Sequence, residues 1–321
     1  MKSSDVLLPN MNDGRLFISP ILGCNGACGY CYLCIHDYKT PRKNQLTEAE
    51  FLREAKKQSE FVLGENGTIV SIGAWGDIFP KGYDELTRHS VDLIKAVLAW
   101  GNPVQIMSKN SLNNEYIEEI ISAIRYPKQL LYSTTITSIQ CWRTIEPFTS
   151  SPTERLETCA YFHNRGVPTN VLLKPFFPTI TGAEIEQICD MLLAYNVDFC
   201  TVGILYWDSK ITEKMSRNPI LKKLIDYEAA ELTCLDCNGY TQLNATRTIE
   251  LLPYVDYLNE KGIRTFLKSS CINANVLQIK NQSNYYEEHN SYCINCGNCA
   301  QKTNPKNVDG VFHIRREENG I

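Results

Sequence analysis

Short apolar runs alternate with longer amphipathic segments between residues 15 and 205. The runs favour buried strands, and the segments between them repeat apolar residues at i, i+3, i+4 and i+7, which is typical of helices. Alternation of this kind indicates βαβ units with parallel strands. The predicted strands are Arg15–Leu22, Thr68–Ala74, Val104–Ser108, Leu130–Thr135, Asn170–Lys174 and Phe199–Leu205. The pattern predicts an α/β fold, a partial (β/α)6 barrel of the TIM type.

Helix start signals support this alternation. Thr47 with Glu50, and Thr181 with Glu184, have the spacing of a capping box ahead of an apolar run. Each pair therefore predicts the first turn of a helix.

The alternation breaks down after residue 206, where charged residues and Asn increase. One more helix and strand are predicted, at Thr248–Glu260 and Arg264–Leu267, and they lead into Cys271. We therefore expect a C-terminal cysteine-rich module that closes the mouth of the barrel. The predicted regions are an N-terminal extension at 1–14, the barrel at 15–205 and the module at 206–321.

Composition limits the class of protein. The chain has 321 residues, of which 43% are hydrophobic and 21% charged, as in globular proteins. Lys and Arg number 32 against 36 Asp and Glu, so there is no overall basic field for a nucleic-acid backbone. The first residues lack the apolar run of a signal peptide, and no run is long enough to span a membrane. We expect a cytoplasmic protein without membrane contact.

The fourteen cysteines change this picture, because in a reducing compartment they indicate metal binding or catalysis rather than disulfides. Cys159 and Cys189 fall on apolar helix faces, and Cys200 lies in a buried strand, so these three are predicted core residues. The remaining clusters are Cys24, Cys28, Cys31 and Cys34 near the start, Cys234 and Cys237 in between, and Cys271, Cys293, Cys296 and Cys299 near the end.

The segment CNGACGYCYL, which starts at Cys24, directly follows the first predicted strand. Loops at the carboxyl ends of strands form the active sites of such barrels. Cys24, Cys28 and Cys31 can hold one [4Fe-4S] cluster, and the glycines between them let the backbone curl round it. Three ligands leave one iron open for the amino and carboxylate groups of S-adenosylmethionine, whose one-electron cleavage yields an adenosyl radical.

Zinc is the alternative for this segment, since Cys34 supplies a fourth thiolate. The spacing, Tyr30 before the third cysteine and the barrel context favour the cluster.

These residues resemble the radical S-adenosylmethionine enzymes, and within them the spore photoproduct lyase-like family. The loop reads GC-x-G-x-C-x-Y-C-Y-L from Gly23 to Leu33. Two later segments carry the same resemblance: IEPFTSSPTERLE, Ile145–Glu157, and GVPTNVLLKPFFP, Gly166–Pro178. The resemblance covers about residues 15 to 205 and implies a reductant of the reduced flavodoxin or ferredoxin type.

The resemblance also implies contacts to S-adenosylmethionine. Tyr30 would lie near the adenine, and GAWGD, from Gly73 to Asp77, replaces the usual glycine-rich turn for the methionine amino group. The remaining implied contacts are the strand-end residues Lys109 and Ser133, and Arg155 near the carboxylate.

One departure bears on the substrate. Photoproduct lyases resemble each other in a hydrogen-donating cysteine that this sequence replaces with Ala74-Trp75-Gly76. Cys141, after the fourth predicted strand, is either a substitute donor or a packed loop cysteine. The missing thiol and the acidic balance favour a peptide or small molecule over nucleic acid. Trp75, Lys174 and Trp207 are expected to line its pocket.

The segment CINCGNC places three cysteines at iron–sulfur spacing near the end of the chain. With Cys271 as a remote fourth ligand, Cys293, Cys296 and Cys299 predict a second [4Fe-4S] cluster. A zinc knot that uses Cys234 and Cys237 with two of the later cysteines is the alternative.

The sequence thus predicts an enzyme that cleaves S-adenosylmethionine and abstracts a hydrogen atom from a peptide or small molecule. The first alternative is repair or modification of a nucleic-acid base. The second is a non-catalytic iron–sulfur or zinc scaffold, against which the intact Cys24, Cys28 and Cys31 argue.

Overall fold

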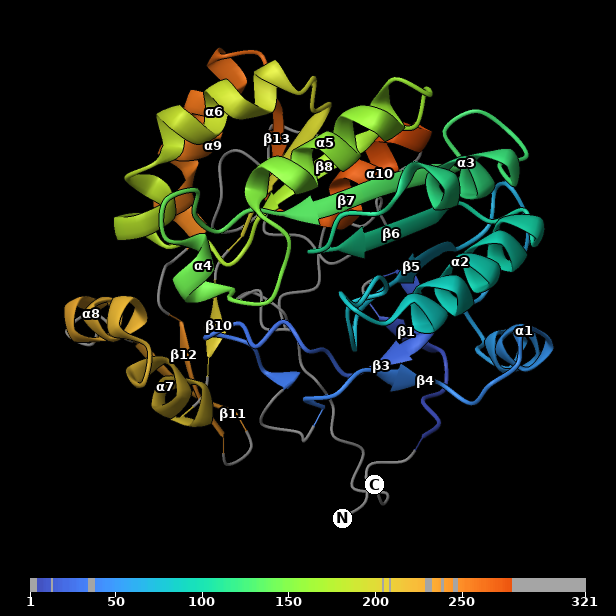
Figure 1. Ribbon diagram of the computed structural model, residues 1–321, viewed down its shortest axis with the longest axis horizontal. Coiled ribbons are helices and arrows are strands. Elements are labelled where there is room, and N and C mark those ends of the chain that lie inside the picture. The colour runs from blue at the N-terminus through green and yellow to red at the C-terminus, as the bar shows by residue number, and fades with distance from the viewer. Residues whose placement is uncertain are drawn as a thin grey trace.

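The computed structural model describes residues 5–12, 14–33, 38–203, 205–207, 209–228, 233–237, 240–244 and 248–278. Its main sheet has the order β1-β2-β5-β6-β7-β8-β9-β13 (Figure 1). Strand β1 pairs antiparallel with β2 at one edge, and all later neighbours pair in parallel. The strands are β1 (Asn10–Asn12), β2 (Arg15–Ile18), β5 (Ile69–Ile72), β6 (Val104–Ser108), β7 (Leu130–Thr135), β8 (Thr169–Leu173), β9 (Phe199–Val202) and β13 (Arg264–Phe266).

The predicted α/β barrel class is confirmed, and each of the six predicted strands overlaps a strand of this sheet. A seventh parallel strand, β13, comes from beyond residue 206 and pairs with β9 through Arg264 and Phe199. The sheet of the partial barrel therefore continues past the predicted boundary at 205. The division into domains remains a prediction.

Helices cover the outer face of the sheet, where strand residues such as Leu16, Ile106 and Val171 join them in the main apolar core. The predicted core cysteines Cys159 and Cys200 lie in this core, as does Cys189. Burial of this apolar surface is the main stabilising contribution to the fold. The covering helices are α1 (Glu48–Lys56), α2 (Asp84–Ala99), α3 (Asn114–Ser122), α5 (Pro152–His163), α6 (Ile185–Ala194) and α9 (Leu252–Glu260).

The two predicted capping boxes have different outcomes. Thr47 and Glu50 form one at the start of α1, as expected. The prediction at Thr181 and Glu184 is wrong, because Thr181 lies inside a π-helical turn (Pro178–Gly182) and its hydroxyl donates to the carbonyl of Thr137 at 2.6 Å. The Glu184 carboxylate instead accepts the hydroxyl of Ser138 at 2.8 Å. Tertiary partners have replaced the local ones at this helix start.

The inner face of the sheet is polar at its centre. The side chains of Gln105, Ser133, Asn170 and Thr201 form a chain of hydrogen bonds across β6, β7, β8 and β9, at 3.1 to 3.3 Å. Helix α10 (Ser269–Leu277) closes this face, because Asn273 donates to Gln105 at 2.8 Å. These buried polar groups are therefore paired with one another, as burial requires.

The remaining elements lie around the carboxyl end of the barrel and beyond it (Figure 1). No helix in the described part of the chain is long and apolar enough to cross a membrane. The elements are β3 (Ile21–Leu22), β4 (Arg42–Lys43), α4 (Trp142–Ile145), β10 (Tyr206–Trp207), α7 (Ser209–Ser216), α8 (Pro219–Glu228), β11 (Thr233–Cys237), β12 (Tyr240–Asn244) and a 3-10 turn at Thr248–Leu251.

Candidate active site

The cysteine loop leaves the sheet at the carboxyl end of β2 and is held there by backbone contacts. The amide of Gly23 donates to the carbonyl of Trp75 at 2.8 Å, and Gly23 forms a bridge with Gly76. Gly23 has a φ of +86°, a left-handed conformation that favours glycine. A side chain at Gly76 would collide with the carbonyl of Gly23. Glycine therefore lets the loops after β2 and β5 lie against each other.

Gly26 lies between two of the three predicted iron ligands. A Cβ atom at this position would lie 3.3 Å from the Sγ atom of Cys24 and 3.7 Å from that of Cys28. The Gly26 amide donates to the Cys24 sulfur at 3.3 Å. The nearest atom to such a Cβ would be the Thr149 methyl carbon at 3.1 Å, so a side chain would be crowded there. A backbone amide aimed at a sulfur suits a thiolate that binds a cluster. These residues fit the group that the sequence predicts.

Burial acts against ionisation of these thiols. It raises the pKa of Cys24 to about 11, with the charge of Asp77 adding to the effect. It raises the pKa of Cys28 to about 12, and the charge of Glu146 adds to the effect there. Lys109 lowers both values. Within the described residues no three His, Cys, Asp or Glu side chains are grouped to hold a single metal ion. In a cubane cluster each thiolate binds a different iron.

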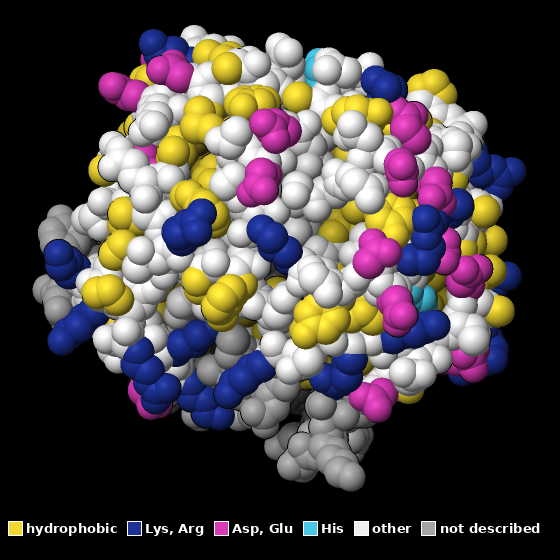
Figure 2. All heavy atoms as spheres, in the orientation of Figure 1, with side chains coloured by type: hydrophobic (Ala, Val, Ile, Leu, Met, Phe, Trp, Pro, Cys, Tyr) yellow, Lys and Arg dark blue, Asp and Glu magenta, His cyan; other side chains and the backbone are white. Residues whose placement is uncertain are grey.

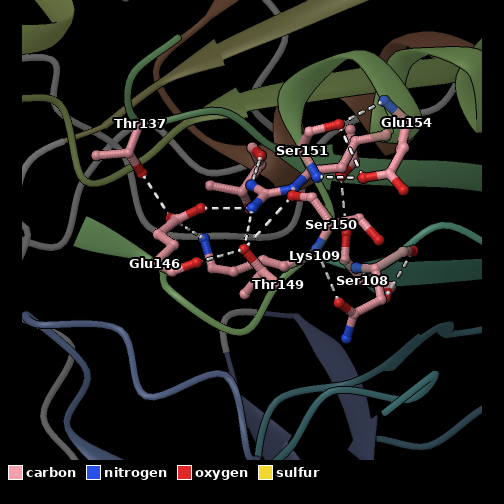
Figure 3. A network of polar contacts seen from close by, with 12 residues as sticks. Ser108, Lys109, Thr137, Glu146, Thr149, Ser150, Ser151 and Glu154 are labelled. Carbon is pink, nitrogen blue, oxygen red and sulfur yellow. Dashed lines mark hydrogen bonds and ion pairs between the residues drawn. The ribbon is translucent and has the colours of Figure 1, made fainter. Parts of the chain in front are cut away.

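A charged network lies directly beside the loop and centres on Glu146 (Figure 3). The Glu146 carboxylate accepts a short hydrogen bond from the Tyr30 hydroxyl and others from Thr137 and the Lys109 ammonium, both at 3.0 Å. Lys109 also donates to the Tyr30 hydroxyl at 2.9 Å. Glu146 is fully buried, so protein groups such as these replace its water.

Arg155 completes the network from α5. Its guanidinium forms an ion pair with Glu146 at 2.6 Å and donates to the carbonyls of Thr135 and Ser150 at 2.6 and 2.8 Å. Another hydrogen bond joins it to the Thr149 hydroxyl. Its side chain is 0% exposed, so the guanidinium is occupied by protein groups. Arg155 therefore orders the segment before its helix while it neutralises Glu146.

Two opposite effects set the ionisation of Glu146. Burial alone would raise the pKa of its carboxyl, but the charges of Arg155 and Lys109 and the Tyr30 hydrogen bond hold that pKa well below its usual range. Glu146 is therefore ionised at neutral pH. The phenol of Tyr30 shows the reverse, because burial and the nearby negative charge of Glu146 raise its pKa well above the usual value. Tyr30 consequently keeps its proton and acts as a donor.

Asp77 ties the turn after β5 to the end of β6. Its carboxylate accepts the Ser108 hydroxyl at 2.6 Å and the backbone amides of Lys109 and Phe79 at 2.8 and 3.0 Å. Burial raises its pKa, although these hydrogen bonds oppose the shift. Gly73 begins this turn with a φ of +114°, where a side chain would lie 2.8 Å from the carbonyl of Met107. The turn thus brings Asp77 beside Cys24.

The structure separates Ser133 from these residues. Ser133 lies two positions before the end of β7, and its hydroxyl accepts hydrogen bonds from Gln105 and Asn170 on the inner face. Cys141 lies closer to the loop, because this half-buried residue packs against the same apolar cluster as Cys28 and Tyr30. The cofactor role of Ser133 and the donor role of Cys141 stay predictions.

The structure describes the neighbours of two expected pocket residues. Trp75 packs its ring against Tyr32 and Tyr38, with ring centroids 6.1 and 5.9 Å apart. Lys174 lies along Gly203. The side chain of Trp207 falls outside the described residues.

The second predicted cluster is mostly beyond the described chain. Cys271 lies in the first turn of α10 and packs beside Leu131 and Phe199, which belong to the amino-terminal parts of β7 and β9. The described part of α10 thus reaches away from the cysteine loop. The remaining residues of this prediction, Cys293, Cys296 and Cys299, lie outside the described residues, as do Cys34 and the side chains of Cys234 and Cys237.

Sequence reasoning missed the centre of the charged network. Glu146 belongs to the segment IEPFTSSPTERLE, and its position nine residues before Arg155 gave no periodic signal. It also missed Lys214 of α7, whose ammonium donates to the carbonyl of Cys28 at 2.6 Å and of Cys31 at 3.3 Å. Nothing in the local sequence links residue 214 to a loop near residue 28.

Comparison with known proteins places this site in context. The profile of the Radical SAM superfamily matches residues 18–192, more than half of the chain. No curated protein matches the sequence.

Solved structures resemble the fold at low sequence identity. Spore photoproduct lyase complexed with dinucleoside spore photoproduct is 18% identical, has a TM-score of 0.58 and covers 77% of this chain and 75% of its own. A mutant of that lyase with bound AdoMet and the same dinucleoside is 17% identical and has a TM-score of 0.59. The match covers 79% of this chain and 76% of the mutant's. SuiB from Streptococcus suis bound to S-adenosylmethionine is 14% identical and has a TM-score of 0.50. The match covers 80% of this chain and 52% of SuiB.

Proposed function

The chain belongs to the radical SAM superfamily, and we propose that it uses a [4Fe-4S] cluster at Cys24, Cys28 and Cys31 to cleave S-adenosylmethionine and abstract a hydrogen atom from a peptide or small molecule. When bound, the reduced cluster supplies the electron that breaks a carbon–sulfur bond of the cofactor. The observation that carries the proposal is the fit of the loop, where Gly26 has no side chain to crowd the sulfurs of Cys24 and Cys28 and its amide donates to the Cys24 sulfur at 3.3 Å.

The chain's own residues provide binding and orientation. The Lys109 ammonium faces the loop and is 22% exposed, so a positive charge remains at the edge of the buried network. Tyr30 keeps its phenolic proton and donates a hydrogen bond to Glu146, which fixes the ring beside the thiols. Arg155 is enclosed by the protein. Its support for S-adenosylmethionine would therefore act through Glu146 and the segment at Thr149 and Ser150.

The substrate class rests on charge and on a missing thiol. The net charge of −4 offers no overall attraction for a polyanion, and Ala74-Trp75-Gly76 replaces the thiol of the lyase-like motif. A peptide or metabolite depends instead on enclosed apolar contacts and a few placed polar groups.

Nucleic-acid repair is the second candidate, and two observations favour it. The fold resembles that of spore photoproduct lyase over about three quarters of both chains. On the face drawn in Figure 2, Lys and Arg side chains gather along the lower edge, which gives a local basic rim. A polyanion would bind along such a rim.

Anaerobic reconstitution tests the cluster and the cleavage. We expect about four irons that disappear when Cys24, Cys28 and Cys31 are all replaced with Ala, together with loss of 5′-deoxyadenosine. The matched control is the triple variant of the core cysteines Cys159, Cys189 and Cys200 to Ala or Val, which should keep both. A second reductant-dependent group of four irons that survives the first variant would support the C-terminal cluster, and one zinc would support the zinc knot. Unchanged deoxyadenosine in the first variant would refute the assignment.

Oligonucleotide binding tests the substrate class. Fluorescence anisotropy with single- and double-stranded oligonucleotides at low salt should show no tight, steeply salt-dependent binding. Micromolar binding that salt abolishes, together with oligonucleotide-stimulated deoxyadenosine release, would instead establish the repair alternative.

A further inference from the structure

Helices α7 and α8 pack directly onto the cysteine loop, although they follow the predicted barrel in the sequence (Figure 1). They share a buried apolar cluster with Cys28 and Tyr30. The helices thus form one wall of the site. The residues they contribute to this cluster are Ile211, Met215, Leu221 and Leu224.

One polar contact and close packing hold this wall in place. Asn218, between the two helices, donates its amide to the carbonyl of Thr144 at 2.8 Å. On the loop itself, Gly29 lies so close to α8 that a Cβ atom there would be 2.6 Å from a Leu221 methyl carbon. A side chain at Gly29 would therefore displace Leu221 of α8.

Lys214 contacts the backbone carbonyls of two predicted iron ligands. Its ammonium donates to the carbonyl of Cys28 at 2.6 Å and to that of Cys31 at 3.3 Å. The two carbonyls belong to a single turn of the loop, since the Cys31 amide donates to the Cys28 carbonyl at 3.1 Å. One ammonium thus holds that turn in the bend that carries both thiols.

The charge of this ammonium has a second effect. Asp77 and Glu146 place negative charge near Cys24 and Cys28, and Lys109 places positive charge there. A cluster that accepts an electron becomes more negative, so a cation fixed beside its ligands stabilises the reduced form. Because Lys214 is half-buried, solvent screens this interaction less than it would at the surface.

We propose that Lys214 is a positioning residue that fixes the turn from Cys28 to Cys31 and raises the reduction potential of the cluster bound there. The inference rests on the proposed cluster at Cys24, Cys28 and Cys31. In the reduction, one electron passes from an external reductant, dithionite or a ferredoxin-type protein, to the cluster. Lys214 is neither oxidised nor reduced.

The test is a potentiometric titration of the anaerobic, iron-loaded protein, followed by electron paramagnetic resonance. The signal to follow is the one that changes when S-adenosylmethionine is added, which distinguishes this cluster from any other. In Lys214→Met, we expect the ratio of reduced to oxidised cluster at the wild-type midpoint to fall about threefold or more. Lys214→Arg should retain most of the ratio because it keeps the charge.

Arg217→Ala is the matched control, because it removes a cation directly after α7. The Arg217 side chain is 73% exposed and forms an ion pair with Glu213. It should leave the ratio unchanged. If Lys214→Met does not fold, Lys214→Gln makes the same comparison, since Gln keeps an N–H donor without the charge.

The possible outcomes separate the two proposals. Full iron content with an unchanged potential in Lys214→Met or Lys214→Gln would overturn the role of Lys214, as would an equal shift in Arg217→Ala. Wild-type protein that binds no iron at Cys24, Cys28 and Cys31, or whose signal ignores S-adenosylmethionine, would contradict the proposed function instead.

Discussion

Two buried polar networks lie in this molecule, and they differ in charge and in place. The network around Glu146 contains Lys109 and Arg155 and lies beside the cysteine loop. The network on the inner face of the sheet joins the neutral side chains of Gln105 and Ser133 with their partners and is closed by α10. At its edge the buried guanidinium of Arg15 donates to Gln105 at 3.2 Å. Both contain fully buried side chains, so burial alone does not distinguish a site from a scaffold.

The difference indicates what each network is built to do. Burying Glu146 and Arg155 carries a large desolvation cost that the ion pair only partly offsets, which a purely structural position would avoid with apolar residues. Neutral amides and hydroxyls such as those of Asn170 and Ser133 have a smaller cost, and their mutual hydrogen bonds satisfy them. Charge beside a cysteine loop is therefore the stronger indication of function.

Removal of the Glu146 charge should cause the largest fall in the free energy of unfolding. Glu146→Gln leaves the fully buried Arg155 guanidinium without its counter-charge, and we expect the free energy of unfolding to fall by about 3–5 kcal/mol. Urea denaturation followed by circular dichroism measures this. The control is Glu213→Gln, whose exposed pair with Arg217 should contribute almost nothing. A loss below about 1 kcal/mol would show that the network is not an energetic unit.

The pH dependence of that loss sharpens the comparison. The pKa of Glu146 is lower in the folded chain than the unfolded value of about 4.3, so its ionised form stabilises the fold fully above that value. This contribution is lost progressively as the pH falls from there towards the lower pKa of the folded state. The stability difference between wild type and Glu146→Gln should therefore stay constant from neutral pH to about 5 and narrow below about 4. Denaturation at each pH measures it. A difference that narrows above pH 5 would contradict the ion pair.

A substitution where the loops after β2 and β5 meet should reduce the stability less than loss of the Glu146 charge. Gly76→Ala places a Cβ atom against the carbonyl of Gly23 and 2.8 Å from that of Ile21, and we expect a loss of about 1–3 kcal/mol together with weaker iron loading. Gly203→Ala is the control, since the three atoms nearest to its Cβ atom would all belong to the flexible side chain of Lys174. Equal effects in the two variants, by denaturation and iron analysis, would count against a backbone clash.

A substitution in the inner-face network of Gln105 and Ser133 should cause the smallest loss of stability and leave cofactor binding unchanged. Ser133→Ala removes the acceptor of two buried amides, and we expect a loss of about 1–2 kcal/mol with unchanged affinity for S-adenosylmethionine. Denaturation and calorimetry measure the two quantities. Ser216→Ala, at the exposed end of α7, is the control. Weaker cofactor binding with unchanged stability would assign Ser133 to the cofactor after all.

The sequence determined most of what depends on local pattern. Apolar runs and helical spacing located the parallel strands from β2 to β9, and the capping box at Thr47 formed because both of its partners are three residues apart. The apolar run before Cys24 placed the cysteine loop at a strand end, where this fold carries its chemistry, and the spacing of its cysteines predicted the cluster.

Only the tertiary structure decided which residues meet. Thr181 and Glu184 have the local spacing of a cap, but the nearby Thr137 and Ser138 offered better partners. Glu146 became the centre of the site, and Lys214 reached a loop far from it in sequence. Periodicity reports the face on which a residue lies, whereas a contact between distant segments depends on how sheet and helices pack. For that reason the pattern along the chain fixed the barrel, and packing selected the partners within it.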